Sequence, residues 1–225
     1  MRFAQFIVQP AIRTFTSVLC LATLTACSST PNLTDNFTTV GVRPPSGQCT
    51  VDPQSVADAV SLGSVEGRGA CGIENAWKVS AVSNVAFSTP AKLRCRMVGA
   101  TNRWIGKVVQ PAARSAFGEP VVKLRIAASY ACRGRDNKRG AKISEHAFGN
   151  ALDVSGFILA SGRVVEVEEG WKNGGRESSF LKQVHGRACG TFTTVLGPKA
   201  NAAHRNHFHF DLGKHGRSGK GKYCR

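Results

Sequence analysis

The sequence has only one long apolar stretch, close to its N-terminus, and this stretch is too short to cross a bilayer comfortably. A protein with several membrane spans is therefore excluded. An internal repeat is also missing, since the 24 glycines and 9 prolines follow no period, which excludes a collagen-like or low-complexity chain. No two cysteines form a C-x-x-C pair, and this absence argues against a zinc ribbon or a thioredoxin-like motif.

Acidic residues are scarce: 14 Asp and Glu stand against 30 Lys and Arg, and the formal net charge is +16. Such a charge predicts a polyanionic partner or surface, namely nucleic acid, anionic lipid or a cell-wall polymer. Aromatic residues make up only 8% of the chain, too few for the stacking platforms that bind single-stranded nucleic acid. Hydrophobic residues make up 42%, enough to bury a core, so wholesale disorder is excluded.

The N-terminus has the order of a secretory signal peptide. Arg2 and Arg13 are the only charges before Cys27, and residues 14–26 are rich in Val, Leu and Ala. The end of this segment, Leu24-Thr25-Ala26-Cys27, resembles the bacterial lipobox, in which the peptidase cuts before a cysteine that becomes lipidated. The alternatives are a plain signal peptide cut near Ala26 or an uncleaved anchor. Ser28 and Ser29 resemble an outer-membrane sorting signal, so we expect an exported lipoprotein on the periplasmic face of the outer membrane.

We therefore predict a lipoprotein signal peptide at residues 1–26, a lipidated cysteine and flexible tether at 27–48, and one domain at 49–225. The tether is rich in Ser, Thr, Asn, Pro and Gly and shows little periodicity. An exported chain seldom meets nucleic acid, so we expect no nucleic-acid partner. Six cysteines remain in the domain, and an even number in an exported chain predicts three disulfides. The sequence does not choose among the possible pairings, and Cys189 with Cys224 is a guess; the six are Cys49, Cys71, Cys95, Cys132, Cys189 and Cys224.

Helical and strand patterns alternate without a regular βαβ rhythm, which predicts an α+β fold with a mainly antiparallel sheet and flanking helices. A helix is expected from Asp52-Pro53 to Gly63, and a second from Thr89-Pro90 to about residue 109, where Pro111 would break or kink it. A third helix is expected over 177–189. Strands are expected over 77–87, 121–126, 150–159, 164–167 and 208–212, and a basic surface loop over 133–142.

Four of the six histidines fall in two clusters, residues 144–153 (SEHAFGNALD) and 204–211 (HRNHFHFD). Because alternate residues of a strand face the same side, His207 and His209 should project together, with the intervening phenylalanine toward the core. A turn after His146 can bring it to Asp153. Two histidines and one carboxylate form a catalytic metal site with an open position, and zinc suits these ligands. Iron bound in an oxygenase-type triad is an alternative, but the α+β pattern and the predicted export argue against it.

The pattern S-x-H-x-x-G-x-A-x-D, starting at Ser144, resembles the metal motif of the D-Ala-D-Ala metallopeptidases. These belong to the lysostaphin, D-alanyl-D-alanine-peptidase and hedgehog (LAS) fold group. The H-x-x-H-x-H stretch from His204 resembles the murein endopeptidases of that group. More closely, residues 130–133, 144–157, 189–198 and 204–212 resemble the bacterial extensin-like C-terminal domain family. The resemblance spans residues 49–224 and implies a disulfide-stabilised LAS-type zinc peptidase fold.

Carried over to this sequence, the resemblance implies that His146, Asp153 and His209 bind Zn²⁺. His207 stands where the dipeptidase branch has a glutamate as general base, and there it would act as general base or stabilise the transition state; the identity of the base stays open. Arg133 follows Tyr130 much as in the Y-R motif of these peptidases and would bind a substrate carboxylate or the oxyanion; otherwise it is one basic residue of a surface loop.

Three further residues complete the expected site. His204 would bind substrate or support a ligand. Glu145, next to His146 in the chain, should point away from the metal. Asp211 would either orient a ligand histidine or lie at the surface at the end of a strand.

These expectations describe an envelope-anchored zinc peptidase, acting as an endopeptidase or a carboxypeptidase on D-Ala-containing peptide bonds of peptidoglycan. The partners would be the peptide stems of the wall and the membrane, reached through the lipid on Cys27. The alternative is a catalytically inactive peptidoglycan-binding or structural lipoprotein of the same fold, because the acidic base is missing.

Overall fold

A mixed sheet of nine strands runs through the part of the chain that the computed structural model describes, which is residue 49 and residues 52–225. The strand order is β1-β2-β3-β4-β5-β8-β7-β9, and β6 also pairs with β5. Only the β3/β4 and β7/β9 pairs are parallel. The strands are β1 (Ala57–Glu66), β2 (Gly72–Val82), β3 (Val85–Arg94), β4 (Val121–Ala128), β5 (Ala151–Leu159), β6 (Val164–Glu166), β7 (Thr194–Leu196), β8 (Phe208–Asp211) and β9 (Tyr223–Cys224).

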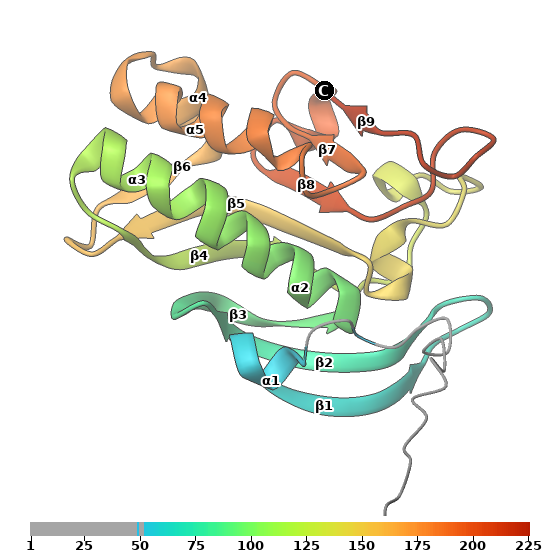
Figure 1. The fold of residues 1–225 in the computed structure, drawn as a ribbon. Coiled ribbons are helices and arrows are strands. Elements are labelled where there is room, and N and C mark those ends of the chain that lie inside the picture. Colours follow the sequence, from blue (N-terminus) through green and yellow to red (C-terminus); the bar gives the residue numbers. More distant parts are fainter. Residues whose placement is uncertain (1–48, 50–51) are drawn as a thin grey trace, which may run out of the picture. The chain divides into compact units, whose positions relative to one another are not determined.

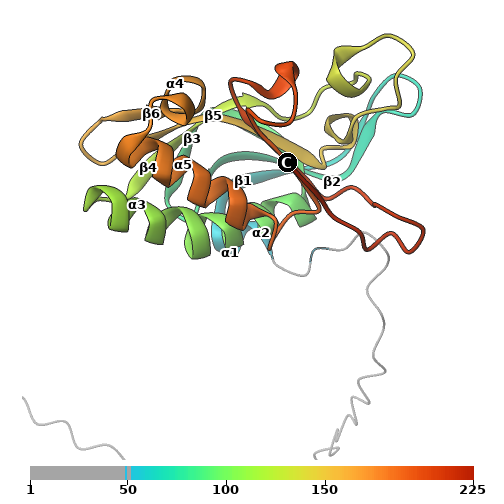
Figure 2. The ribbon, with the colours of Figure 1, turned by 90° about the horizontal axis from the view of Figure 1, so that it is seen from above.

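Helices flank this sheet (Figure 1), so the predicted α+β class with a mainly antiparallel sheet is confirmed. Figure 2 shows α2, α3 and α5 lying together against one face of the strands. The helices are α1 (Pro53–Val56), α2 (Cys95–Trp104), the π-helical η1 (Ile105–Val109), α3 (Gln110–Phe117), α4 (Val167–Lys172) and α5 (Gly175–Ala188), with 3-10 turns η2 (Arg135–Asn137), η3 (Glu145–Phe148) and η4 (Ala202–His204). Among the described residues, no helix is both long and apolar enough to cross a membrane.

Trp104 of α2 lies at the centre of the core between the helices and the sheet. Its ring packs against Phe157, Phe192 and Phe210, and its indole N–H donates to the carbonyl of Val184 in α5 at 3.1 Å. A buried indole needs such an acceptor, since an unpaired N–H would be costly to bury. Phe210 thus holds β8 against the helices from one side and leaves the other face of the strand for polar side chains.

The first third of the domain differs from the prediction. The helix expected from Pro53 to Gly63 ends after Val56, although Asp52 caps it by accepting from the amide of Gln54 at 3.1 Å. From Ala57 the chain pairs with β2 along an exposed sheet edge. Tertiary pairing therefore overrides the local helix signal, as it commonly does in short segments.

The expected strand over 77–87 is in fact the hairpin of β2 and β3. Its turn residues Ser83 and Asn84 both have positive φ, 51° and 61°, as a tight hairpin turn requires. The start of the helix expected from Thr89 is also wrong, because β3 continues to Arg94. The helix itself begins at Cys95 and includes the rest of the expected range. Pro90 falls where the pairing of β3 with β2 is interrupted, so its missing N–H removes no ladder bond.

Pro111 does not end its helix. It stands in the first turn of α3, directly after the wider π-helical turn η1, and the chain stays helical from Cys95 to Phe117. A π-helical turn is one of the recognised ways in which a helix accommodates such a residue. The later elements agree with the prediction to within a few residues: β4, β5, β6, α5 and β8 all lie where strands or a helix were expected.

Three disulfides join the six cysteines of the domain, as predicted. They are Cys49–Cys95, Cys71–Cys132 and Cys189–Cys224, and the last confirms the guessed pairing. The Cys71–Cys132 bond holds the segment after β4 against the start of β2, and Cys189–Cys224 holds β9 against the end of α5. The predicted signal peptide, Cys27 and the tether lie outside the described residues.

Candidate metal centre

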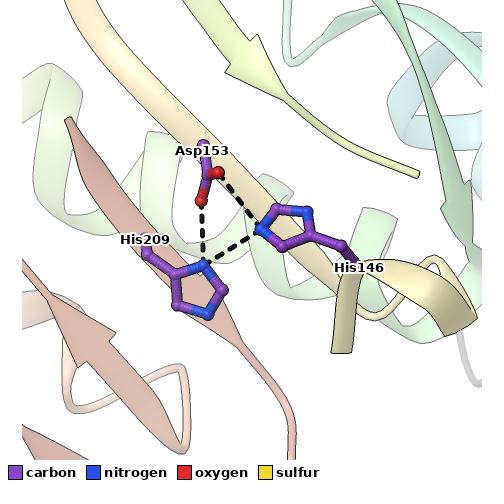
Figure 3. Close-up of side chains that lie close together, drawn as sticks. All are labelled: His146, Asp153 and His209. Atoms are coloured by element: carbon purple, nitrogen blue, oxygen red, sulfur yellow. Dashed lines mark hydrogen bonds and ion pairs between the residues drawn. The ribbon is translucent and has the colours of Figure 1, made fainter. Parts of the chain in front are cut away.

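Three buried side chains from three different elements converge at one end of the sheet (Figure 3). His146 lies on η3, Asp153 on β5 and His209 on β8. His146 Nε2 is 3.1 Å from Asp153 Oδ2 and 3.1 Å from His209 Nδ1, and His209 Nδ1 is 2.8 Å from Asp153 Oδ1. The structure thus brings together the three residues that the sequence predicted as metal ligands.

The local sequence explains how His146 reaches Asp153. The Ser144 hydroxyl caps η3 by accepting from the amide of His146, and Gly149 ends the turn in the left-handed region with φ of 59°. The amide of Asn150 then donates back to the carbonyl of Glu145 at 3.0 Å, so the chain reverses before β5 begins. On the other side, the β5/β8 register places Asp153 directly opposite His209.

Each of the two imidazoles is oriented by a contact of one ring nitrogen with a residue outside the cluster of three. His146 Nδ1 lies 2.5 Å from the carbonyl oxygen of Ser129, which can only accept, so Nδ1 donates and Nε2 faces the centre. His209 Nε2 lies 2.9 Å from Asp211 Oδ2, so the other ring nitrogen, Nδ1, faces Asp153. Asp211 is buried and also accepts from the amide of Gly213 at 2.8 Å. Of the two positions expected for Asp211, the structure therefore has the one in contact with a candidate ligand and not the one at the surface.

The charges of the cluster are strongly coupled. Burial alone would raise the pKa of Asp153, but hydrogen bonds from His146 and His209 outweigh it and hold the pKa well below its usual range. Burial would lower the pKa of His209, yet hydrogen bonds to Asp153 and Asp211 raise it to about 9. The carboxylate of Asp153 thus stays ionised, and a positive charge beside it would stabilise it. Two imidazole nitrogens and a carboxylate oxygen fit zinc in their chemistry, with a cation replacing the proton on His209.

A cavity of about 510 Å³ is lined by His146 and His209 of this cluster, and its lining also includes His204, His207 and Arg133, the three residues expected to act in catalysis. His207 Nε2 and Arg133 Nη2 each lie 3.7 Å from Asp153 Oδ2. His207 stands just before β8 rather than on it, but still faces the same side as His209.

The His204 ring lies 5.2 Å from that of His207 and 5.7 Å from that of His209, measured between ring centroids. Its Nδ1 is 2.8 Å from the side-chain oxygen of Asn201. Burial, together with the charges of His209 and His207, lowers the pKa of His204 to about 4. Burial likewise lowers the pKa of His207. Both rings are therefore neutral at pH 7 and can accept a proton.

Glu145 lines the cavity, but its carboxylate accepts from the side chain of Asn150 at 2.6 Å. The carboxylate of Glu145 is thus bonded to Asn150, and Glu145 is not among the three converging residues. The sequence analysis missed Thr194, His215 and Tyr223, which line the cavity from β7 and the C-terminal segment. Thr194 lies in segment 189–198, whose family resemblance implied no role for it, and His215 and Tyr223 lie in a tail without a motif. The one available signal for the tail was the guessed Cys189–Cys224 bond, which predicts that it folds back onto the domain.

Comparisons with known proteins give one match. No curated protein and no solved structure matches the chain. The family described as extensin-like protein C-terminus matches residues 48–225, which is the whole predicted domain and most of the chain. The chain therefore belongs to the extensin-like protein C-terminus family.

Proposed function

We propose that the chain is an envelope-anchored zinc metallopeptidase with a LAS-type fold that hydrolyses peptide bonds of peptidoglycan, those involving D-Ala by resemblance. The observation that carries the proposal is the convergence of His146 Nε2, Asp153 and His209 Nδ1 beside a cavity that also holds His207 and Arg133. These three residues would hold the zinc. When bound, zinc polarises a carbonyl group and lowers the pKa of water to about 7.

His207 is suited to move the proton. Its Nδ1 lies 2.9 Å from the side-chain oxygen of Asn206, an acceptor, so Nδ1 carries the hydrogen and Nε2 has its lone pair toward Asp153. Burial lowers the pKa of His207, which keeps the ring neutral and ready to accept. In the proposed reaction His207 Nε2 takes a proton from the attacking water and delivers it to the amine as the C–N bond breaks.

Arg133 supplies fixed positive charge at the same place. Its guanidinium approaches the oxygen of Asp153 that His207 also approaches, and its side chain is 28% exposed. The group therefore faces both the centre and the open cavity. This position suits a role in stabilising the oxyanion or in binding a substrate carboxylate through two N–H donors.

Two basic loops flank the cavity and favour an anionic polymer as substrate. Residues 133–142 and 213–225 both contribute to its lining. Lys222 donates to the carbonyl of Cys189 and Arg225 lies over the ring of Tyr223. The other exposed cations of these loops form no ion pair with another described residue, so they are open to an external anion; they are Arg135, Lys138, Arg139, Lys142, Lys214, Arg217 and Lys220. The carboxylates of the peptide stems of the wall would match this charge. A lipid on Cys27 would hold the enzyme at the membrane, within reach of the wall.

One observation favours the second candidate, an inactive wall-binding or structural lipoprotein of the same fold. The carboxylates of Asp153 and Asp211 both bond to His209, and that of Glu145 bonds to Asn150. These three carboxylates are thus engaged with other side chains, and none of the three is shown in the position of an acidic base. The same cavity and basic loops would then bind the wall without cleaving it.

The test is the zinc content of the purified full-length chain by elemental mass spectrometry, with His146→Ala, Asp153→Ala and His209→Ala beside it. We expect about one zinc per chain, lost in all three variants, while the disulfide-linked fold survives by circular dichroism. His185→Gln is the matched control, since His185 is a buried histidine that packs against Trp171 and Phe208 and is not among the three converging residues, so its loss should not change the zinc content.

Incubation of the zinc-loaded chain with isolated peptidoglycan separates the two candidates. New amine and carboxyl termini in the peptide stems, absent with Asp153→Ala, support the peptidase. Binding without new termini supports the inactive lipoprotein. A wild-type chain that stays free of zinc even after zinc is added contradicts the metal site and with it the peptidase.

A further inference from the structure

We propose that the C-terminal segment 213–225 forms part of the metal centre, with Thr194 and His215 as positioning residues that hold Asp211 and, through it, His209. The proposal rests on the proposed zinc site and adds two residues to it, from a strand and a tail that no sequence motif connects to the ligands.

The sheet register places the first link. Thr194 of β7 lies directly opposite Asp211 of β8, and directly opposed residues in an antiparallel pair share one face of the sheet. The Thr194 hydroxyl therefore lies on the same face as the Asp211 carboxylate, close enough to interact with it. Both residues are buried, so the hydroxyl is held on the carboxylate with little competition from water.

His215 supplies the second link from the tail. Its Nε2 lies 2.7 Å from Thr194 Oγ1. In the proposed arrangement the Thr194 hydroxyl donates to Asp211, since a carboxylate only accepts, and its oxygen accepts from the Nε2–H of His215. The hydrogen-bonded chain His215–Thr194–Asp211–His209 therefore has one defined direction at each step.

This series of hydrogen bonds from His215 to His209 determines which ring nitrogen of His209 carries the proton. Asp211 accepts from the amide of Gly213 at 2.8 Å and from His209 Nε2 at 2.9 Å, and in the proposed arrangement also from Thr194. As the acceptor for His209 Nε2–H, Asp211 keeps the proton of the ring on that nitrogen. His209 Nδ1 is then left for the metal, in the orientation that it already has toward Asp153.

The tail is built to place His215. The amide of Gly221 donates to the His215 carbonyl at 2.9 Å and closes a small loop, and the His215 ring lies 6.1 Å from the ring of Tyr223. The amide of Tyr223 donates to the carbonyl of Thr193 at 2.7 Å, and the next residue, Cys224, is bonded to Cys189. The disulfide, the β9 pairing and the loop together fix the imidazole beside Thr194.

The experiment measures the zinc affinity of the full-length chain by competition with a chromophoric chelator, and the absorption bands of the Co²⁺-substituted protein. Thr194→Val keeps the shape of the side chain but loses the hydroxyl, whereas Thr194→Ser keeps the hydroxyl. We expect Thr194→Val and His215→Phe to weaken zinc binding by about 10- to 100-fold and to shift the Co²⁺ bands, and Thr194→Ser to remain close to the wild type. Thr101→Val is the control, because it removes a buried hydroxyl that bonds only to a helix carbonyl at 2.9 Å in α2.

The outcomes separate the two proposals. If the wild type binds zinc and both Thr194→Val and His215→Phe bind it equally tightly with unchanged Co²⁺ bands, the positioning role is wrong and the zinc site stands. A Thr194→Ser variant as weak as Thr194→Val also overturns the role, since the hydroxyl would not be what matters. If the wild type itself binds no metal, the proposed function fails and this inference falls with it. Should Thr194→Val not fold, His215→Phe in the tail tests the same link.

Discussion

Gly149 lies directly against Ile73 of β2: a Cβ atom on Gly149 would stand 2.7 Å from Ile73 Cδ1. Ile73 is almost fully buried, so it cannot move aside easily. Gly149 also has φ of 59°, a conformation that glycine adopts without strain. This glycine ends the turn that carries His146 and leads the chain into the strand of Asp153, so a close contact with β2 fixes the first half of the candidate metal site.

Gly149→Ala should therefore disturb the fold and the site together. The left-handed backbone and the clash with Ile73 should lower the free energy of unfolding by about 2 kcal/mol or more, measured by urea denaturation. Zinc affinity should fall as well, because His146 is displaced. Gly118→Ala is the control: its φ is 78° and a Cβ there meets nothing within 4 Å, so it isolates the backbone contribution. Equal losses of stability in both variants would show that the contact with Ile73 contributes nothing.

His207→Gln should lower kcat by about 10²- to 10⁴-fold on a cleavable peptidoglycan peptide, because the neutral imidazole facing Asp153 is lost. The zinc content should not change, since His207 is not among the three converging residues. Arg205→Gln serves as control, because Arg205 is exposed and pairs with Glu168 outside the site. Wild-type kcat in His207→Gln would require another group as the general base.

Arg133→Ala should lower kcat/KM by at least about 10-fold, because a guanidinium that can stabilise the oxyanion or a substrate carboxylate is removed. Arg125→Ala is the matched control, since Arg125 lies on β4 and pairs with Glu166. Steady-state kinetics on the same peptide separates a change in KM from a change in kcat. Equal activity of the two variants would show that Arg133 has no role in the reaction and is one basic residue of a surface loop.

His185 should make the fold sensitive to mild acid. Its ring packs against Trp171 and Phe208, and its Nε2 has no hydrogen-bond partner among the described residues. Burial lowers the pKa of His185 below its ordinary value, so the folded state stays neutral while the unfolded chain takes up a proton as the pH falls below about 6.5. Protonation of the unfolded state alone lowers the stability of the fold.

The free energy of unfolding should therefore fall more between pH 8 and pH 5 in the wild type than in His185→Gln. Above the unfolded pKa the two pH profiles should run parallel, because neither state binds the proton there. Urea denaturation at several pH values gives both profiles. Parallel profiles over the whole range would assign the acid sensitivity to other groups.

Cys27→Ser should release the protein from the membrane. If the lipobox is functional, the wild-type chain incorporates labelled palmitate and fractionates with membranes, and the variant does neither. The expected loss is large, because several acyl chains on one cysteine hold a protein firmly. A variant that still fractionates with membranes would favour the uncleaved anchor as the alternative.

The second half of the domain was predictable because its signals are local. The alternation over 121–126, the Ser144 cap, the Gly149 turn and the alternating residues around His209 each determine structure within a few positions. The first third was mispredicted because β1 and β3 are formed by pairing with β2. The helix signals at Asp52-Pro53 and Thr89-Pro90 are real but weaker than that pairing.

The sequence pointed to two histidine motifs as a metal site, and their resemblance to the zinc peptidases implied the set that the structure gathers as candidate ligands, His146, Asp153 and His209. It also determined that all six domain cysteines would pair, because their number is even. Only the tertiary structure decided that Thr194 and His215 stand behind Asp211. Their positions depend on the β7/β8 register and on the Cys189–Cys224 bond, which join segments distant in the chain, and no short-range pattern in a single sequence encodes such pairings.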